Sequence, residues 1–61
     1  EQLYAALDAL PDKQGRRIYA HYILGLSKTA IAAAEGVSIE AVSVAIERGL
    51  KGMEVFLRKV L

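Results

Sequence analysis

The sequence has no cysteine, no long apolar run and almost no excess of charge of either sign. Without cysteine, neither disulfides nor thiolate metal sites can reinforce the fold, so stability must come from packing. The apolar runs are far shorter than the roughly 18 residues of a membrane span, and no signal-peptide pattern is present. We therefore expect a cytoplasmic protein that does not enter a membrane.

Patterns that usually mark enzymes are also missing. The chain has no glycine-rich phosphate loop, no paired carboxylates in a pocket-forming context and no nucleophile accompanied by a base. Its single histidine, His21, has no second metal ligand at motif spacing, so we expect it on the surface or half-buried. The sequence thus predicts no enzymatic activity, no cofactor and no metal.

What is present is a short, alanine-rich chain. Its 61 residues allow one domain at most, residues 1–61, and because the first residue is Glu1 rather than Met we expect a piece of a longer chain. Hydrophobic residues make up 54% of the sequence, and their many alanines favour helix. The net charge of +1 neither predicts nor excludes binding to nucleic acid, because the local distribution of charge decides it.

Apolar spacing predicts four helices and no strand, which makes the fold class all-α. The first helix is expected over residues 2–10 and the second over 11–24, with Pro11 at its first position and Gly25 ending it in a left-handed conformation. Ser27 is predicted to cap a short third helix that ends near residue 35. Ser38 is predicted to cap a fourth helix that continues to the C-terminus.

Each predicted helix has an apolar stripe that should face the core. In the first and third helices these residues are Leu3, Leu7, Leu10, Ile31 and Ala34. In the second helix they are Gly15, Ile18, Tyr19, Tyr22, Ile23 and Leu26. In the fourth helix they are Val42, Ile46, Leu50, Met53, Leu57 and either Val60 or Leu61. Gly49 and Gly52 lie three residues apart on the fourth helix and indicate either a bend or the close approach of another helix.

The stretch from Ser27 to Ile46 fits a helix-turn-helix, in which two helices joined by a short turn cross steeply. Ala32 is small where the two helices should touch, and Gly36 suits a turn that needs positive φ. We expect Val37 to fill the core from within the turn and Val42 and Ile46 to anchor the second helix. An ordinary pair of antiparallel helices is the alternative, but the several residue types in register favour the DNA-reading type.

The same residues carry a family resemblance. They are Leu10-Pro11, Gly25-Leu26-Ser27, Ile31-Ala32, Gly36-Val37-Ser38, Val42, Ile46, Gly49-Leu50 and Met53. With them the chain resembles region 4 of bacterial sigma-70-type RNA polymerase sigma factors, from about residue 3 to residue 57. The resemblance implies a small four-helix domain whose last helix enters the major groove of the promoter −35 element. It also implies that another face docks on the β-subunit flap of the RNA polymerase core.

The resemblance places the DNA contacts on the outward face of the fourth helix, and the start of the third helix is either a phosphate contact or a solvated helix start. The candidate residues are Lys28, Thr29, Ser38, Ile39, Glu40, Ser43, Val44, Glu47 and Arg48. Lys28 and Thr29 can hold a phosphate together with the helix N-terminus. The fourth helix has no Lys or Arg before Arg48, so its early face offers bases serines, aliphatic groups that can touch a thymine methyl, and glutamates that can accept from cytosine.

That composition leaves a second function open, a protein-interaction or dimerisation module that keeps the fold with weak or no DNA binding. Val55 and Phe56 lie outside the apolar stripe of the fourth helix, and they either complete a thin core or form a second surface, including a homodimer contact through this helix. A dimeric response-regulator output domain also has four helices, but the Leu-Pro opening favours the sigma family.

A basic cluster lies on the second helix, formed by Lys13, Arg16 and Arg17. We expect a solvated face there, with phosphate or polymerase contacts as the alternative.

Overall fold

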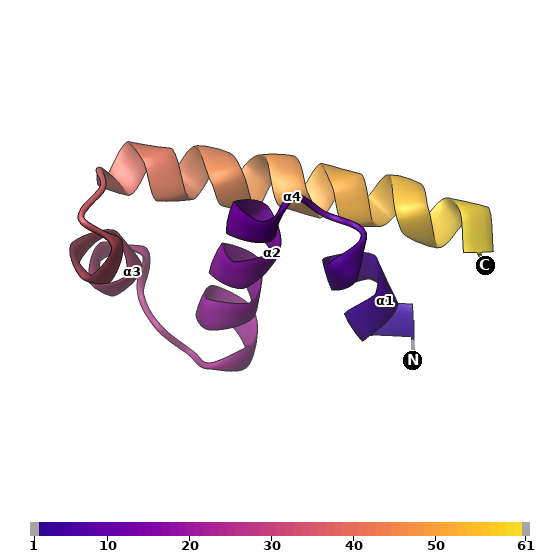
Figure 1. Cartoon of the computed structure of the whole chain (residues 1–61), viewed down its shortest axis with the longest axis horizontal. Helices are drawn as coiled ribbons and strands as arrows, with labels where there is room; N and C mark the ends of the chain where they lie inside the picture. The colour runs from indigo at the N-terminus through magenta and orange to yellow at the C-terminus, as the bar shows by residue number, and fades with distance from the viewer. Residues whose placement is uncertain (1, 61) are drawn as a thin grey trace.

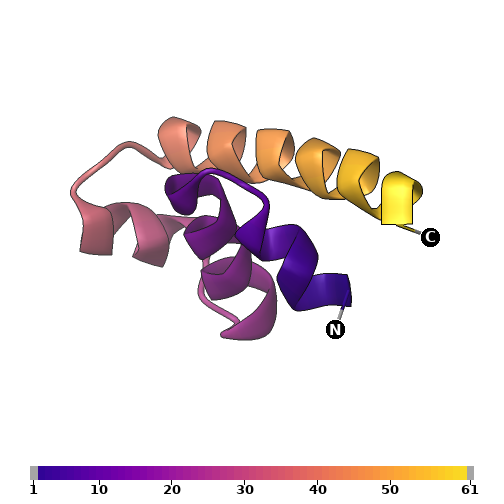
Figure 2. The same cartoon turned by 45° about the vertical axis from the view of Figure 1, so that its right-hand side comes forward.

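The computed structural model describes residues 2–60, which form α1 (Gln2–Asp8), α2 (Asp12–Ile18), the π-helical η1 (Tyr19–Ile23), α3 (Lys28–Glu35) and α4 (Ile39–Val60). No strand occurs between residues 2 and 60, so the all-α expectation is confirmed. The 22-residue α4 runs the length of the molecule, and the other helices lie along one side of it (Figure 1). From the start of α4 to its end these neighbours are α3, α2 and α1 (Figures 1 and 2).

Within residues 2–60 no single helix has both the length and the apolar character needed to cross a membrane, and one bent pair, α3 with α4, meets those criteria by length and composition only.

The core lies where α1, α2 and α3 pack against the first two-thirds of α4. It contains Ala6, Leu7, Ile18, Ile31, Ala32, Val42, Ile46 and Met53, and Leu10, Ala20, Phe56 and Leu57 pack against it while partly exposed. The side chain of Val42 is completely buried. Gly49 is buried on the same stripe of α4, where Ile18 of α2 occupies the space that a Cβ atom would need. Of the two expectations for this glycine, the close approach of a helix is therefore the one observed.

The predicted stripe of the second helix is wrong after Ile18. Tyr19, Tyr22, Ile23 and Leu26 are 37%, 57%, 43% and 43% exposed rather than buried. At this point the chain leaves α-helical geometry for η1, in which the Leu24 N–H donates to the Tyr19 oxygen five residues earlier at 3.1 Å. The wider turn shifts the η1 side chains away from the face that a 3.6-residue period assigns to them, and Leu26 follows Gly25, where the helix has already ended.

Several smaller expectations also change. The first helix ends at Asp8 rather than residue 10, and Pro11 is the residue before α2 rather than its first helical residue. The third helix buries Ala32 beside Ile31, whereas Ala34 faces solvent. On α4 the buried stripe passes through Gly49 and Met53, which leaves Leu50 42% exposed beside it. The prediction for Leu61 lies outside the described residues.

Candidate nucleic-acid interface

Local hydrogen bonds cap both helices of the helix-turn-helix. Ser27 caps α3 because its Oγ accepts from the Ala30 N–H at 3.0 Å, and Ser38 Oγ accepts in the same way from the Ala41 N–H at 3.1 Å. Between them Gly36 has φ +70°, a left-handed conformation that costs little for glycine alone. The two helices meet at 112°, as expected for a helix-turn-helix.

The turn itself differs from expectation at one residue. Val37 is 38% exposed and does not fill the core, although its N–H donates to the Ala32 oxygen at 3.0 Å and closes the end of α3. Ala32 is buried at the contact of the two helices, and Val42 and Ile46 anchor α4, as the sequence predicts. The crossing therefore depends on a small residue in α3 and two branched residues in α4.

The predicted contact residues lie together at this end of the molecule. Ile39 and Val44 are 44% and 42% exposed although both are aliphatic. Thr29, Ser38, Glu40, Glu47 and Arg48 are exposed, and Lys28 and Ser43 are half-buried. We call the α4 side chains of this group, with the cap Ser38, the outward face of α4.

Two hollows flank the outward face of α4. The η1-side hollow, of about 430 Å³, is lined by Tyr22, Lys28, Ser43, Val44, Ile46, Glu47, Leu50 and Lys51. The α2-side hollow, of about 580 Å³, is lined by Pro11, Lys13, Gln14, Arg17, Ser38, Glu40, Ala41, Val44, Ala45 and Arg48. Val44 lines both and therefore lies on the ridge between them.

Basic side chains occur in each hollow, which adds two residues to the predicted set. Lys51 joins Lys28 on the η1 side, and Lys13 joins Arg48 on the α2 side. Lys51 follows Glu47 by four residues, so helical spacing alone could have placed it on this face. Lys13 belongs to α2 and reaches α4 only through tertiary packing, which no local pattern reveals.

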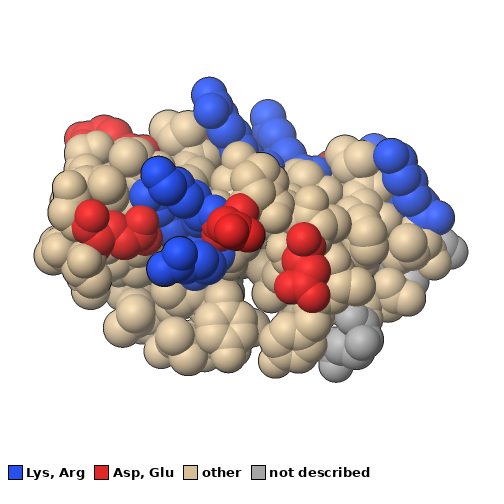
Figure 3. All heavy atoms as spheres, in the orientation of Figure 1, with Lys and Arg blue, Asp and Glu red and all other residues tan. Residues whose placement is uncertain are grey.

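The basic cluster of α2 is not a uniformly solvated face, so that expectation is wrong for Arg17. Arg17 is only 7% exposed, and its guanidinium binds the Glu35 carboxylate, with Nη2 2.7 Å from Oε1 and Nε 3.1 Å from both oxygens. Its Nη1 also donates to the Ala41 oxygen at 3.4 Å. Lys13 and Arg16 remain exposed, and Figure 3 shows basic side chains over α2 with acidic ones on either side.

The ion pair changes the titration of both partners. The hydrogen bonds from Arg17 lower the pKa of Glu35 below its ordinary value of 4.5, and the charges of Arg17, Arg16 and Lys13 act in the same direction against the opposing effect of burial. The hydrogen bond to Glu35 raises the pKa of Arg17. Both groups are therefore ionised at neutral pH.

The remaining sequence candidates lie elsewhere. His21 is half-buried as expected, and its Nδ1–H donates to the Leu26 oxygen at 2.8 Å, which closes the loop before α3. No group of three or more His, Cys, Asp or Glu residues between residues 2 and 60 is placed to hold a metal ion. Val55 is 49% exposed, whereas Phe56 packs partly against the core.

The family comparison agrees with this geometry. The family described as Sigma-70, region 4 matches residues 1–53, which include the whole helix-turn-helix. No curated protein and no solved structure matches the chain. Because the match covers most of the chain, the protein belongs to the sigma-70 region 4 family of non-enzymatic helix-turn-helix modules that act in transcription.

Proposed function

We propose that this chain binds double-stranded promoter DNA by inserting the outward face of α4 into the major groove. The observation that supports this most is the pair of hollows beside that face, each lined by two basic residues that are not held by a carboxylate, whereas Arg17 in the α2-side hollow is bound to Glu35. Lys28 and Lys51 lie on one side, and Lys13 and Arg48 on the other. A helix that lies in the major groove has a phosphate backbone on each side of it, so cations on both flanks can be used at once.

The residue types assign phosphate contacts and base contacts to different side chains. The four flanking cations contact phosphates and set the register, while Ser43, Val44 and Glu47 meet base edges between the two backbones. A glutamate accepts from the amino group of cytosine, and an aliphatic side chain contacts the methyl of thymine. The readout therefore favours cytosine and thymine edges, without the arginine–guanine contact that is commonest in specific complexes.

The test is a fluorescence-anisotropy titration of a labelled duplex at several salt concentrations. Four phosphate contacts predict that log K falls against log[salt] with a slope of about −3.6. Lys13→Ala or Lys51→Ala should weaken binding to duplexes of any sequence and make the salt slope shallower by about one. Alanine at Lys59, an exposed residue near the end of α4, is the control and should change neither. Undetectable binding at ~50 mM salt contradicts the proposal, because even nonspecific binding is measurable there.

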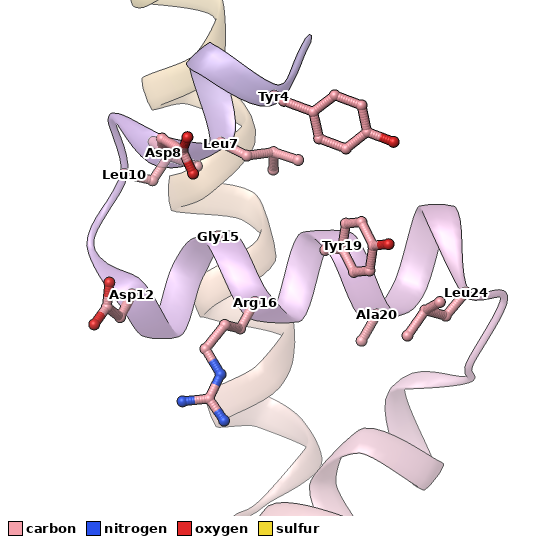
Figure 4. A pocket seen from close by; sticks show the side chains of 10 residues that line it. All are labelled: Tyr4, Leu7, Asp8, Leu10, Asp12, Gly15, Arg16, Tyr19, Ala20 and Leu24. Carbon is pink, nitrogen blue, oxygen red and sulfur yellow. The ribbon is translucent and has the colours of Figure 1, made fainter.

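The polymerase core is proposed to bind on a different surface of the molecule. A hollow of about 460 Å³ opens there between α1, α2 and η1, and we call it the Tyr4–Tyr19 hollow. Figure 4 shows the Leu7 side chain and the Tyr4 and Tyr19 rings around it, with Asp8 from the end of α1 near its rim. Exposed aromatic side chains beside an apolar pocket are typical of the central residues of protein interfaces.

Purified polymerase core tests this second contact. Leu24 lines the Tyr4–Tyr19 hollow and is 59% exposed, so Leu24→Ser should weaken binding to the core without unfolding the chain. Val55→Ser is the matched control, because Val55 is also aliphatic and, at 49%, exposed, but lies outside that hollow. Equal binding by both variants and the unmodified chain contradicts this docking site.

The alternative function is a protein-interaction or dimerisation module without DNA binding. The absence of Lys and Arg from the exposed α4 positions before Arg48 favours it, because Glu40 and Glu47 repel phosphates. Sedimentation velocity over a range of concentrations decides the self-association part. A chain that dimerises through α4 and ignores duplex DNA supports the alternative, and a concentration-independent monomer removes the homodimer.

A further inference from the structure

Arg17 joins three helices through one side chain. It belongs to α2, its Nε and Nη2 donate to the carboxylate of Glu35 at the last residue of α3, and its Nη1 donates to the main-chain oxygen of Ala41 in the first turn of α4. Residues 36–38 are the only covalent connection between α3 and α4. The guanidinium therefore forms a second, non-covalent connection across the helix-turn-helix.

The geometry of the guanidinium restricts how the groups that it joins can rotate relative to one another. A guanidinium is planar and holds its N–H donors in a fixed fork, so a two-oxygen contact with a carboxylate allows little rotation. The Arg17 side chain is 8% exposed and that of Glu35 34%, so solvent competes weakly for the arginine. Between residues 2 and 60, every buried side-chain nitrogen or oxygen has a hydrogen-bond partner. The buried guanidinium of Arg17 therefore leaves no buried donor unpaired.

We propose that Arg17 and Glu35 are positioning residues of the DNA interface, which fix the direction in which α4 leaves the turn without contacting DNA themselves. The hydrogen bond to Ala41 lies two residues before Ser43 and three before Val44, so a small rotation of α4 at that point moves the outward face. The effect on DNA affinity rests on the proposed function, whereas the effect on helix direction does not.

The free protein tests the direction of α4. Because the chain has no cysteine, spin labels can be attached at cysteines introduced in place of two exposed residues, Ala33 of α3 and Glu54 of α4. The distance distribution between the labels should be narrow in the otherwise unmodified chain. It should shift or broaden in Arg17→Met, and less so in the milder Glu35→Gln. Arg16→Met is the matched control, because it removes the same charge from an exposed neighbour and should leave the distribution unchanged.

Duplex titrations then separate positioning from direct phosphate contact. Arg17→Met should raise the Kd about tenfold at every salt concentration with an unchanged salt slope, because no phosphate contact is lost. The double exchange Arg17→Glu with Glu35→Arg should restore part of the affinity. A slope that becomes shallower by about one means that Arg17 contacts a phosphate and overturns the proposal.

Two further outcomes test the positioning role and the proposed function separately. Label distances that do not change in Arg17→Met and Glu35→Gln overturn the positioning role, and circular dichroism confirms that each variant measured is folded. An unmodified chain that binds no duplex contradicts the proposed function alone, and the label distances still decide whether the pair sets the direction of α4.

Discussion

Gly15 of α2 lies against the main-chain oxygen of Leu7 in α1, so closely that a Cβ atom on Gly15 would be 2.9 Å from that oxygen. The neighbour is backbone and cannot turn aside as a side chain could. Alanine is the better helix former by ~1 kcal/mol, but here we expect Gly15→Ala to destabilise the protein by about 1–3 kcal/mol through overpacking. Urea unfolding followed by circular dichroism measures the change.

Gly52→Ala is the control for that prediction. A Cβ atom on Gly52 would be 2.6 Å from Cδ2 of Leu10, which is the far end of a half-buried and flexible side chain. The side chain can move, so the stability should change much less than in Gly15→Ala. Equal losses in the two variants would mean that α1 is not held against α2 as described.

The serine caps should each contribute measurably to stability. Ser38→Ala removes the acceptor for the Ala41 N–H and Ser27→Ala the acceptor for the Ala30 N–H, so each should cost about 1 kcal/mol. Ser43→Ala is the matched control, because Ser43 lies within α4 and caps no helix. Thermal melts of the three variants should rank Ser43→Ala as the most stable, and a loss as large for Ser43→Ala as for the caps would argue against the capping account.

These caps also show what could be predicted from sequence. Ser27, Ser38, Gly25 and Gly36 act through the backbone within a few residues, so local rules were sufficient to place them, and both glycines have positive φ as expected. The candidate contact residues follow from the same register. They lie together because helical spacing and a short turn leave little freedom.

What could not be predicted depends on distant parts of the chain. The π-helical turn at Tyr19–Ile23 leaves three residues of the predicted stripe on the surface, and the spacing of apolar residues does not reveal such a turn. Arg17 is buried only because Glu35, 18 residues later, provides its counter-charge. Lys13 joins the α2-side hollow for a similar reason, since α2 crosses α4 there.

The Arg17–Glu35 pair predicts a loss of stability in acid. Because Arg17 lowers the pKa of Glu35 in the folded state, the contribution of the pair is fully present above the ordinary value of 4.5. It disappears as the pH falls through the lower folded value, when the carboxylate is protonated and the charges of Arg17, Arg16 and Lys13 no longer face an anion. The urea concentration at the midpoint of unfolding should therefore decrease as the pH is lowered below about 4.5.

Glu35→Gln provides the comparison for the acid prediction. It should destabilise the protein by about 1–3 kcal/mol at pH 7, because the arginine keeps a weaker, neutral acceptor. Its stability should depend less on pH, so the gap between the variant and the unmodified chain should narrow in acid. A gap that stays constant from pH 7 to pH 3 would show that other carboxylates cause the acid loss.

Glu47 provides a test of base readout. A glutamate accepts from cytosine, whereas glutamine pairs with adenine through two hydrogen bonds, so Glu47→Gln should shift the preference at one position from cytosine towards adenine. Selection from a randomised duplex pool, followed by sequencing, measures the preference before and after the change. Glu54→Gln removes the same charge from α4 outside the outward face and should leave the preference unchanged. Identical preferences in both variants would place Glu47 away from the bases.

The most direct test of DNA binding by α4 is to map the contact on the protein itself. Amide chemical shifts of the 15N-labelled chain are recorded while an unlabelled duplex is added at low salt. If the outward face of α4 enters the major groove, shifts change at residues 28–29 and 38–51 and near Lys13, whereas α1 and the Tyr19 and Leu24 side of the Tyr4–Tyr19 hollow are unaffected. Changes confined to α1 and that hollow, or no changes at all, would contradict the claim that the outward face of α4 binds DNA.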